Sequence, residues 1–392
     1  MKKEIITIGL CMIFVSMILG CSFLGGGSKN ETKLTVEQGI GVVGTLNVDE
    51  LNPGLDGYIS LTVRNNLGGE SASKVYVSLD NVEPFKIFEC GAFHNVSSEI
   101  RDCTGEFSLD KYLPYRSHGE SKMFPGQELQ FYWRLRAPSK TEISNIALRH
   151  PIYYDLEYDY RTTFTQNIIF MSQQEVLRRR QAGETYQVEG EASSGAGELR
   201  VTGATQQPVT YQFMNPSDIT TTESEFPFSL SYAVTNEGKG LPLSDVVVLV
   251  ELPRGKFDSA KKDIVADNET MSQYGWMKFK DMESEGTNCS TGSGEKNCST
   301  WIQETYGNEF NSLFGTAITE DRLLVKIVKR TDFINEFSLY LPLKLVAGDR
   351  TSGMTALKNL QIPIQIYGFK MHNMYRYFTE GSSEIAVFPV RV

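Results

Sequence analysis

Residues 57–79 read GYISLTVRNNLGGESASKVYVSL, and residues 227–250 read PFSLSYAVTNEGKGLPLSDVVVLV. In both stretches apolar residues take every second position on either side of a turn that contains Gly and Asn. This is the pattern of two antiparallel strands joined by a hairpin, with one face of each strand buried. Because helical periodicity is scarce in the rest of the chain, we expect an all-β protein.

The two stretches align with each other without a gap. Val63 aligns with Val234 and Asn65 with Asn236, and the segments VYVSL and VVVLV follow at the same offset. Any two strands share an alternation of valines, so the shared Asn and Gly spacing is the evidence that counts. We therefore interpret the chain as one fold used twice, in two tandem antiparallel β-sandwiches.

The closing strands repeat at a larger offset, where Tyr158-x-Tyr160 aligns with Tyr375-x-Tyr377. The larger offset indicates an insertion in the second half. We place it at about residues 261–321 and expect a large exposed loop there, because the region is polar. The paired tyrosines either tie a strand crossover by a hydroxyl-to-backbone bond or are half-buried packing residues.

We place the first sandwich at residues 35–172 and the second at residues 198–392. The first ends in IYYDLEYDYRTTFTQNIIF, whose alternation is so long that we expect a strand, a turn and a second strand. Between the sandwiches, residues 173–197 begin after Ser172-x-x-Glu175, a capping box that predicts a short linker helix. The Gly/Ser/Ala-rich EGEASSGAGE that follows predicts a linker.

These strand beginnings resemble a known family. Val63-Arg64-Asn65, then Gly68-Gly69 and VYVSL, and the second copy with Val234-Thr235-Asn236, are similar to the start of the adhesion-related (CARDB-like) immunoglobulin-like domains of prokaryotic cell-surface lipoproteins. The resemblance covers about a quarter of each sandwich. It implies roughly seven to nine strands per domain, a structural or adhesive role, and no catalytic residues.

The N-terminus predicts export. Lys2 and Lys3 precede an apolar run over residues 5–19, which is the order of a signal peptide, here residues 1–20. The sequence Ile-Leu-Gly-Cys ending at Cys21 resembles the lipobox of prokaryotic lipoproteins, which implies a lipid on the Cys21 sulfur. An uncleaved spanning helix is the alternative. Both anchor the chain at the outer face of the cell membrane.

The segment after Cys21 predicts a tether. Residues 21–34 include three consecutive glycines and a serine, a composition that behaves as a flexible linker. Such a segment would lift the folded part of the chain off the membrane surface. The membrane is therefore the first partner that we expect.

The cysteines agree with an extracytoplasmic address. Beyond the signal region the chain has Cys90, Cys103, Cys289 and Cys298, which form two local pairs. In an oxidising compartment we expect the disulfides Cys90–Cys103 and Cys289–Cys298. Zinc sites use closer Cys-x2-Cys spacing with further ligands nearby, so we expect no metal.

Glycosylation acceptors of the form N-x-[ST] point outward as well. Several of them fall in or near the expected loop, together with the second cysteine pair. They are Asn30, Asn95, Asn268, Asn288 and Asn297.

Composition limits the possible partners and chemistry. A formal net charge of −10 and a pI near 5.1 argue against nucleic acid as a partner. Ser71-x-x-Lys74 matches the letters of penicillin-binding enzymes but lacks their other motifs. Asp155, Glu157 and Asp159 share one face of a strand, where a calcium or glycosidase site competes with a solvated face, which we favour. We therefore expect no enzyme and no cofactor.

Three functional hypotheses remain. The first is a non-catalytic surface module with a structural, adhesive or envelope-interaction role, whose partner is another surface protein or an envelope polymer. The second is a carbohydrate- or solute-binding protein, and the third is a subunit of an envelope or secretion assembly. For the second, exposed rings in the expected loop would form a stacking platform, and the candidates are Tyr274, Trp276, Trp301 and Tyr306.

Overall fold

The computed structural model describes residues 42–48, 50–66, 70–94, 97–101, 107–108, 122–144, 146–184, 192–211, 225–254, 263–333, 335–346 and 363–388. All of these lie in one compact unit, Gln38–Val392. The predicted signal peptide, Cys21 and the tether lie outside the described residues. No helix in the described ranges has the length and apolar character needed to cross a membrane.

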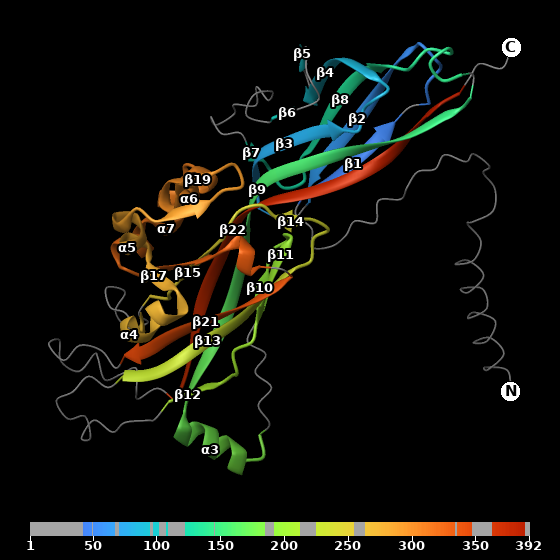
Figure 1. Ribbon diagram of the computed structural model, residues 1–392. Coiled ribbons are helices and arrows are strands. Elements are labelled where there is room, and N and C mark those ends of the chain that lie inside the picture. The colour runs from blue at the N-terminus through green and yellow to red at the C-terminus, as the bar shows by residue number, and fades with distance from the viewer. Residues whose placement is uncertain are drawn as a thin grey trace, which may run out of the picture. The chain divides into compact units, whose positions relative to one another are not determined.

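The first half of the chain contributes a five-stranded antiparallel sheet (Figure 1). Its strands alternate buried and exposed side chains as the sequence predicts. In spatial order they are β1 (Val42–Val48), β2 (Asp56–Asn65), β8 (Glu128–Arg136), β4 (Lys86–His94) and β5 (Ser97–Arg101).

The second half contributes a four-stranded antiparallel sheet built in the same way. In spatial order its strands are β11 (Leu199–Gly203), β13 (Glu225–Asn236), β21 (Glu336–Val346) and β16 (Ile264–Ala266). The expectation of an all-β protein with antiparallel sheets is therefore confirmed.

A central sheet of eleven strands joins the two halves. Its main path runs β17 (Trp276–Lys278), β20 (Leu323–Val328), β15 (Val246–Glu251), β22 (Ile364–Val387), β9 (Leu148–Ser172), β3 (Ala72–Asp80) and β6 (Phe107–Ser108). Four short strands extend it: β10 (Ala192–Ser194) and β12 (Val209–Tyr211) pair with β9, β14 (Leu241–Pro242) with β22, and β7 (Lys122–Met123) with β3.

Strands β9 and β22 form one continuous ribbon through both halves. They pair antiparallel from Leu148↔Val387 to Met171↔Ile364, and Figure 1 shows them side by side along their whole length. The stretch that the sequence analysis divided into strand, turn and strand is thus a single strand of 25 residues. The expected boundary at residues 173–197 is not a break in the hydrogen bonding, because β22 returns from the second half to pair with the first part of β9.

The repeat in the sequence is a repeat in the register. Tyr76 stands opposite Glu157 in the first half, as Val247 stands opposite Met374 in the second. Within the ribbon, Tyr160 pairs with Tyr375 and Tyr158 with Tyr377. An approximate two-fold axis therefore passes through the pair between them, Asp159 and Arg376.

The repeated tyrosines tie turns by their hydroxyl groups. Tyr160 Oη accepts from Glu70 N at 3.0 Å, and Tyr377 Oη accepts from Gly240 N at 3.0 Å. All four rings are buried. The hydroxyl-to-backbone alternative is therefore the one observed, at equivalent turns of both halves.

Glu198 lies at the centre of this tyrosine cluster with no exposed surface. Tyr158 Oη donates to its Oε1 at 2.6 Å, Tyr375 Oη donates to its Oε2 at 3.0 Å, and Val42 N donates to Oε1 at 3.1 Å. Burial raises the pKa of the Glu198 carboxyl, and these hydrogen bonds oppose that shift. The carboxylate joins β1, β9 and β22 at one point.

Residues 267–321, here called the lobe, are not the loop that the sequence predicted. They form a folded unit with its own apolar core, which includes Met282, Ile302 and Phe314. Its elements are α4 (Asn268–Met271), η1 (Ser272–Tyr274), β17, α5 (Phe279–Glu285), β18 (Asn288–Ser290), β19 (Glu295–Asn297), α6 (Cys298–Tyr306) and α7 (Glu309–Thr319).

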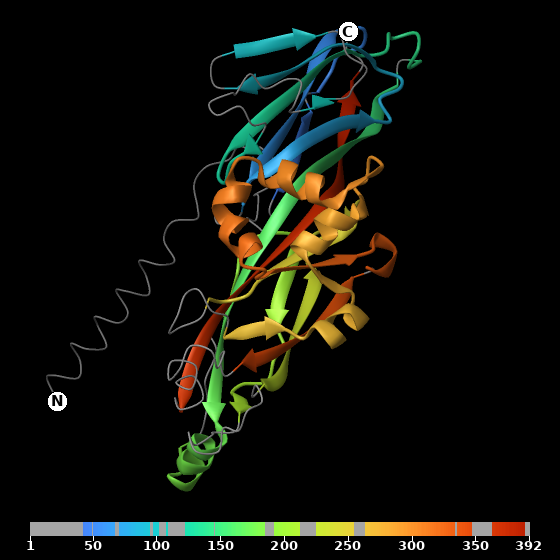
Figure 2. The ribbon, with the colours of Figure 1, turned by 90° about the vertical axis from the view of Figure 1, so that its left-hand side faces the viewer.

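The lobe packs on one face of the central sheet. Its core is continuous with Val247 and Leu249 of β15, Val325 of β20 and Met374 of β22. Figure 2 shows the lobe helices in front of the ribbon, on one side only. A short 3-10 turn, η2 (Arg330–Asp332), follows β20.

The structure contains the predicted disulfide Cys289–Cys298, which joins β18 to the start of α6. Cys90 is buried in β4 and is also disulfide-bonded, and its expected partner Cys103 lies outside the described residues.

The predicted linker helix is present as α3 (Gln173–Gln181). Ser172 Oγ accepts from Glu175 N at 3.3 Å, as the capping box predicts. Ion pairs with Arg178 and Arg179 lower the pKa of Glu175 to about 2.

Candidate functional site

The predicted stacking platform is wrong, because the structure buries most of its rings. Trp276, Trp301 and Tyr306 expose at most 1% of their surface. Trp301 and Tyr306 belong to the core of the lobe, and the Trp276 indole donates to Tyr340 O at 2.8 Å. Only Tyr274 is exposed, and it packs against Tyr340. The rings hold the lobe together and leave no shared surface for a sugar.

The glycosylation acceptors have different surroundings. Asn268 and Asn288 are exposed, and Asn297 is half-buried. The side-chain oxygen of Asn297 accepts from Ser299 N and Thr300 N and so caps α6. Asn30 and Asn95 lie outside the described residues. Glycosylation stays a prediction.

A cavity of about 490 Å³ lies between the lobe and the face of the central sheet that belongs to the first half. Such a volume is within the usual range of small-molecule sites. Strand β3 contributes Lys74, Tyr76, Val77 and Ser78, β9 contributes Asp155, Glu157 and Asp159, β22 contributes Arg376, and the lobe contributes Thr291, Ser293, Lys296 and Trp301.

Strand geometry explains the acidic wall of this pocket. Asp155, Glu157 and Asp159 occupy alternate positions of β9, so their side chains leave the same face of the sheet. The sequence analysis identified this row and favoured a solvated face. Instead the lobe borders it, and cross-strand pairing sets Tyr76 beside Glu157 and Arg376 beside Asp159.

Asp159 is the most buried acid of the pocket, with 1% of its surface exposed. The Lys74 ammonium lies 3.5 Å from its Oδ2 and the Arg376 guanidinium 3.9 Å from its Oδ1. Neither carboxylate oxygen accepts a hydrogen bond from the described residues within normal geometry. Burial raises the pKa of Asp159, although Lys74, Arg376 and Trp301 each act to lower it.

The cations of the pocket are already paired. Arg376 binds Glu157 Oε2 at 2.9 Å and lies over the Tyr76 ring at 5.2 Å. Lys74 and Lys296 share Glu304 Oε2, each at 3.1 Å. Burial acts to lower the pKa of Lys74, but Asp159 and Glu304 together raise it. Lys74 is therefore a fixed positive charge.

Asp155 differs from the other two acids. Its pKa is raised to about 6, first by burial and then by the neighbouring carboxylates of Asp80, Glu380 and Glu157. Asp155 stands opposite Glu380 on β22. Among the described residues no cation pairs with it, so this end of the pocket carries uncompensated negative charge.

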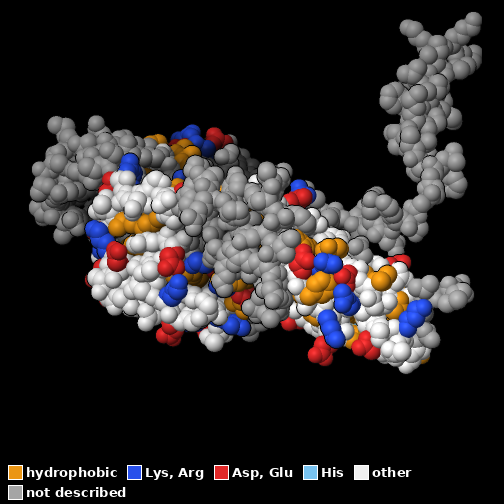
Figure 3. All heavy atoms as spheres, turned by 90° about the horizontal axis from the view of Figure 1, so that it is seen from above, with side chains coloured by type: hydrophobic (Ala, Val, Ile, Leu, Met, Phe, Trp, Pro, Cys, Tyr) orange, Lys and Arg blue, Asp and Glu red, His pale blue; other side chains and the backbone are white. Residues whose placement is uncertain are grey.

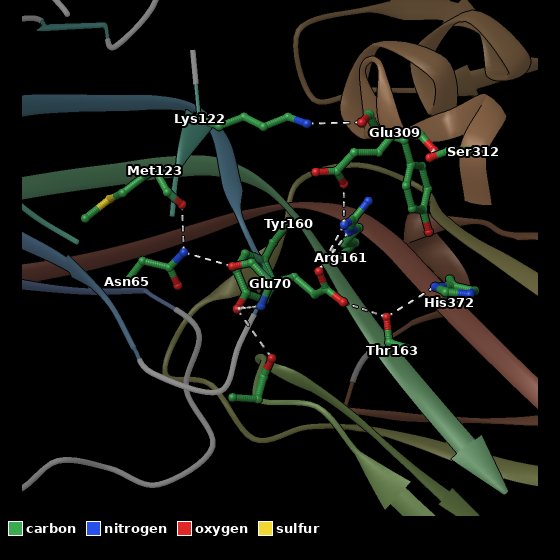
Figure 4. Close-up of polar contacts among 12 residues, drawn as sticks. Asn65, Glu70, Lys122, Met123, Tyr160, Arg161, Thr163, Glu309, Ser312 and His372 are labelled. Atoms are coloured by element: carbon green, nitrogen blue, oxygen red, sulfur yellow. Dashed lines mark hydrogen bonds and ion pairs between the residues drawn. The ribbon is translucent and has the colours of Figure 1, made fainter. Parts of the chain in front are cut away.

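A second polar cluster fastens the lobe to the ribbon (Figure 4). Arg161 of β9 pairs with Glu70 and with Glu309 of α7, each at 3.0 Å, and stacks on the Tyr306 ring. Thr163 Oγ1 donates to Glu70 at 2.9 Å and lies 3.2 Å from His372 Nδ1. This arrangement is structural, since the groups satisfy one another.

His372 is kept neutral in this cluster. Burial lowers its pKa to about 3, and Arg161 and Lys370 add to the effect. Because the single proton of Thr163 Oγ1 goes to Glu70, the His372 Nδ1 must carry the proton that it donates to Thr163. His372 is thus unsuited to general-base chemistry near neutral pH.

Within the described ranges no three His, Cys, Asp or Glu side chains form a group that could hold a metal ion. On the face drawn in Figure 3, Lys and Arg side chains are interspersed with Asp and Glu. The pocket is therefore the feature on which a binding function can be built.

No protein-family model matches the chain, and no curated protein is similar to it. Three solved structures show weak likeness. AvmM, described as catalysing macrocyclization in alchivemycin A biosynthesis, has a TM-score of 0.20 and 12% identity over 40% of this chain and 89% of its own. The sporulation control protein Spo0M from Bacillus subtilis has a TM-score of 0.17 and 10% identity over 51% and 69%.

The third is the mavirus major capsid protein, with a TM-score of 0.18 and 7% identity over 94% of this chain and 96% of its own. Scores this low carry no argument about fold or function. The immunoglobulin-like resemblance of the sequence stays a prediction.

Proposed function

We propose that this chain is a non-catalytic binding protein on the outer face of the cell membrane, which captures a small polar ligand in the pocket between the lobe and the sheet. The observation that carries the proposal is the buried Asp159 in the pocket wall, whose oxygens lack a hydrogen-bond donor. Buried acceptors without donors are costly, so such a group favours a ligand that supplies donors.

The disulfide Cys289–Cys298 supports an extracytoplasmic location, since such bonds persist in oxidising compartments. The signal-like segment and the lipobox-like Cys21 support an anchor there. We also propose that each half is derived from one immunoglobulin-like sandwich, because the repeated sequence and the repeated register agree.

Binding fits the pocket better than catalysis. The residues that line it include no His and no Cys. The hydroxyls of Thr291 and Ser293 have no base beside them in the pocket, because Lys74 is held in its charged form. The acids and cations neutralise one another and can orient a ligand.

Thermal-shift screening with and without a blocked pocket tests the proposal. Ser293 lies in the β18–β19 turn at the pocket, and Ser293→Trp would fill the space. Ser284→Trp, on an exposed position of α5, is the matched control. A library of saccharides, amino acids, amines and anions should contain a compound that raises the Tm of the natural chain and of S284W but not of S293W. If every stabilising compound acts equally on S293W, the pocket is not the site.

A second candidate is a structural or adhesive module, or an assembly subunit, and the β9–β22 ribbon favours it. A ribbon of 24 or 25 residues per strand makes a stiff spacer between two sheets. Crosslinking in intact cells tests this role. A partner protein captured equally by the natural chain and by S293W would support it, whereas recovery of the chain alone would count against it.

The anchor has its own test. If Cys21 carries a lipid, Cys21→Ser should release the protein from the membrane, because the acyl chains are lost. Intact-mass measurement of the mature protein checks the modification. A product that still begins at Met1 would contradict a lipoprotein.

A further inference from the structure

The charges of the pocket are unequally satisfied. Lys74 and Lys296 both bind Glu304, and Arg376 binds Glu157, all at 3.2 Å or less. The acids have the remaining unmet demand. Asp159 lacks a hydrogen-bond donor, and Asp155 lacks a cation among the described residues.

The acidic end extends beyond Asp155. Asp80 at the end of β3 and Glu380 of β22 lie close enough to shift the titration of Asp155. The partly exposed ring of Tyr76 stands opposite Glu157 at the border of this end. Carboxylates beside an aromatic ring form the surroundings in which proteins bind ammonium groups, through ion pairs and cation–π contacts.

We infer that the pocket recognises a small cationic amine, with the ammonium group at Asp155 and Glu157 and further donors directed toward the buried Asp159. This inference rests on the proposed function and names its ligand class. It does not rest on the acidic row alone, since Asp159 exposes only 1% of its surface and has oxygens without hydrogen-bond donors in the wall of the cavity.

An anionic ligand fits these charges poorly. It would have to take Lys74, Lys296 or Arg376 from their present carboxylate partners, which would leave Glu304 or Glu157 without a cation. A neutral sugar would satisfy Asp159 but would leave the negative charge around Asp155 uncompensated. The amine meets both demands. The hydroxyls of Thr291 and Ser293 can bind polar substituents on the opposite side.

Isothermal titration with paired probes tests the inference on the full mature chain. D-glucosamine and N-acetyl-D-glucosamine differ at one position, where the first carries an ammonium group and the second a neutral amide. Putrescine provides amines without a sugar ring, and inorganic phosphate provides the opposite charge. At pH 7 we expect glucosamine and putrescine to bind at least about tenfold more tightly than N-acetylglucosamine, and phosphate not to bind.

Variants locate the interaction. Asp155→Asn should weaken amine binding about tenfold or more, whereas Glu128→Gln, at an exposed acid on β8 outside the pocket, should not. Thermal melting of both variants confirms that they fold. Affinity of the natural chain for amines should fall as the pH is lowered from 7 to 5, because Asp155 then takes up a proton.

The outcomes separate this inference from the proposed function. Equal binding of both sugars, lost in S293W, would overturn the amine and leave a solute-binding protein. Phosphate binding, or amine binding that D155N leaves unchanged, would also overturn it. If none of the probes binds, the amine class is wrong, and the wider library described above decides whether the pocket binds a solute at all.

Discussion

The two halves use the same face of the central sheet in opposite ways. In the first half this face carries polar side chains along β3 and β9 and borders the pocket. In the second half the equivalent positions of β15 and β22 lie under the lobe. In register, Tyr76, Ser78, Asp155 and Glu157 of the first half correspond to Val247, Leu249, His372 and Met374 of the second.

This difference shows that a repeated backbone leaves the use of each face open. Val247, Leu249 and Met374 are fully buried and form the floor of the lobe. Their counterparts Tyr76 and Ser78 remain partly exposed beside the pocket. One copy thus supports an added unit, and the other keeps a free surface that the edge of that unit converts into a cavity.

The largest effect should come from the centre that both halves share. Glu198→Ala would leave the buried Tyr158 and Tyr375 hydroxyls without their acceptor, at a cost of about 4 kcal/mol in the free energy of unfolding. Because the ribbon joins the halves, we expect a single transition at lower temperature in differential scanning calorimetry. Two separate transitions would show that the halves unfold independently.

Exchanging equivalent residues tests the two faces directly. Leu249→Ser places the first half's residue under the lobe and should destabilise it by about 3 kcal/mol, since a cavity and a buried hydroxyl result. The reverse change, Ser78→Leu, should alter the free energy of unfolding by less than about 0.5 kcal/mol. Chemical denaturation measures both, and equal effects would contradict the assignment of a covered and an open face.

The disulfide should stabilise the lobe rather than the first half. Replacing both Cys289 and Cys298 by Ser removes a cross-link that closes a short segment, which should cost about 2–3 kcal/mol locally. Hydrogen exchange should then rise in α5 and α6 while β2 and β8 keep their protection. Uniform loss of protection would mean that the lobe does not open separately.

The smallest effect concerns the pH dependence of the open face. The pKa of Asp155 in the folded chain, about 6, lies above its ordinary value, so the stability it contributes is present at low pH and is lost as the pH rises to 6 and above. Asp155→Asn should therefore raise the Tm slightly at pH 7 and leave it unchanged below about pH 4. A lower Tm at pH 7 would contradict the shift.

Much of the fold follows from local patterns. Alternation located β2, β3, β13 and β15, and the capping box located α3. Alternation cannot say whether a long strand is folded back, because both arrangements give the same period of two. The β9 stretch was therefore divided where the structure continues it, and with it the independence of the halves was overestimated.

The lobe left signals that alternation does not show. Phe310, Phe314 and Ala317 are spaced for one face of a helix, which is α7. The unbroken apolar run Val246 to Val250 is typical of a strand buried on both faces and so predicts a cover over β15. The acidic row of the pocket was recognised, but Lys74 and Arg376 join it through strand order, which no local pattern contains.

The pairing of β9 with β22 also sets the order in which an exported chain can mature. As the chain emerges from a translocation channel, β9 is complete long before its partner, the last strand of the sheet. Until β22 arrives, the long edge of β9 presents unpaired backbone groups that other chains can pair with. Secretion of this protein therefore creates a demand for a periplasmic or surface chaperone that grows with the time taken to deliver the final residues.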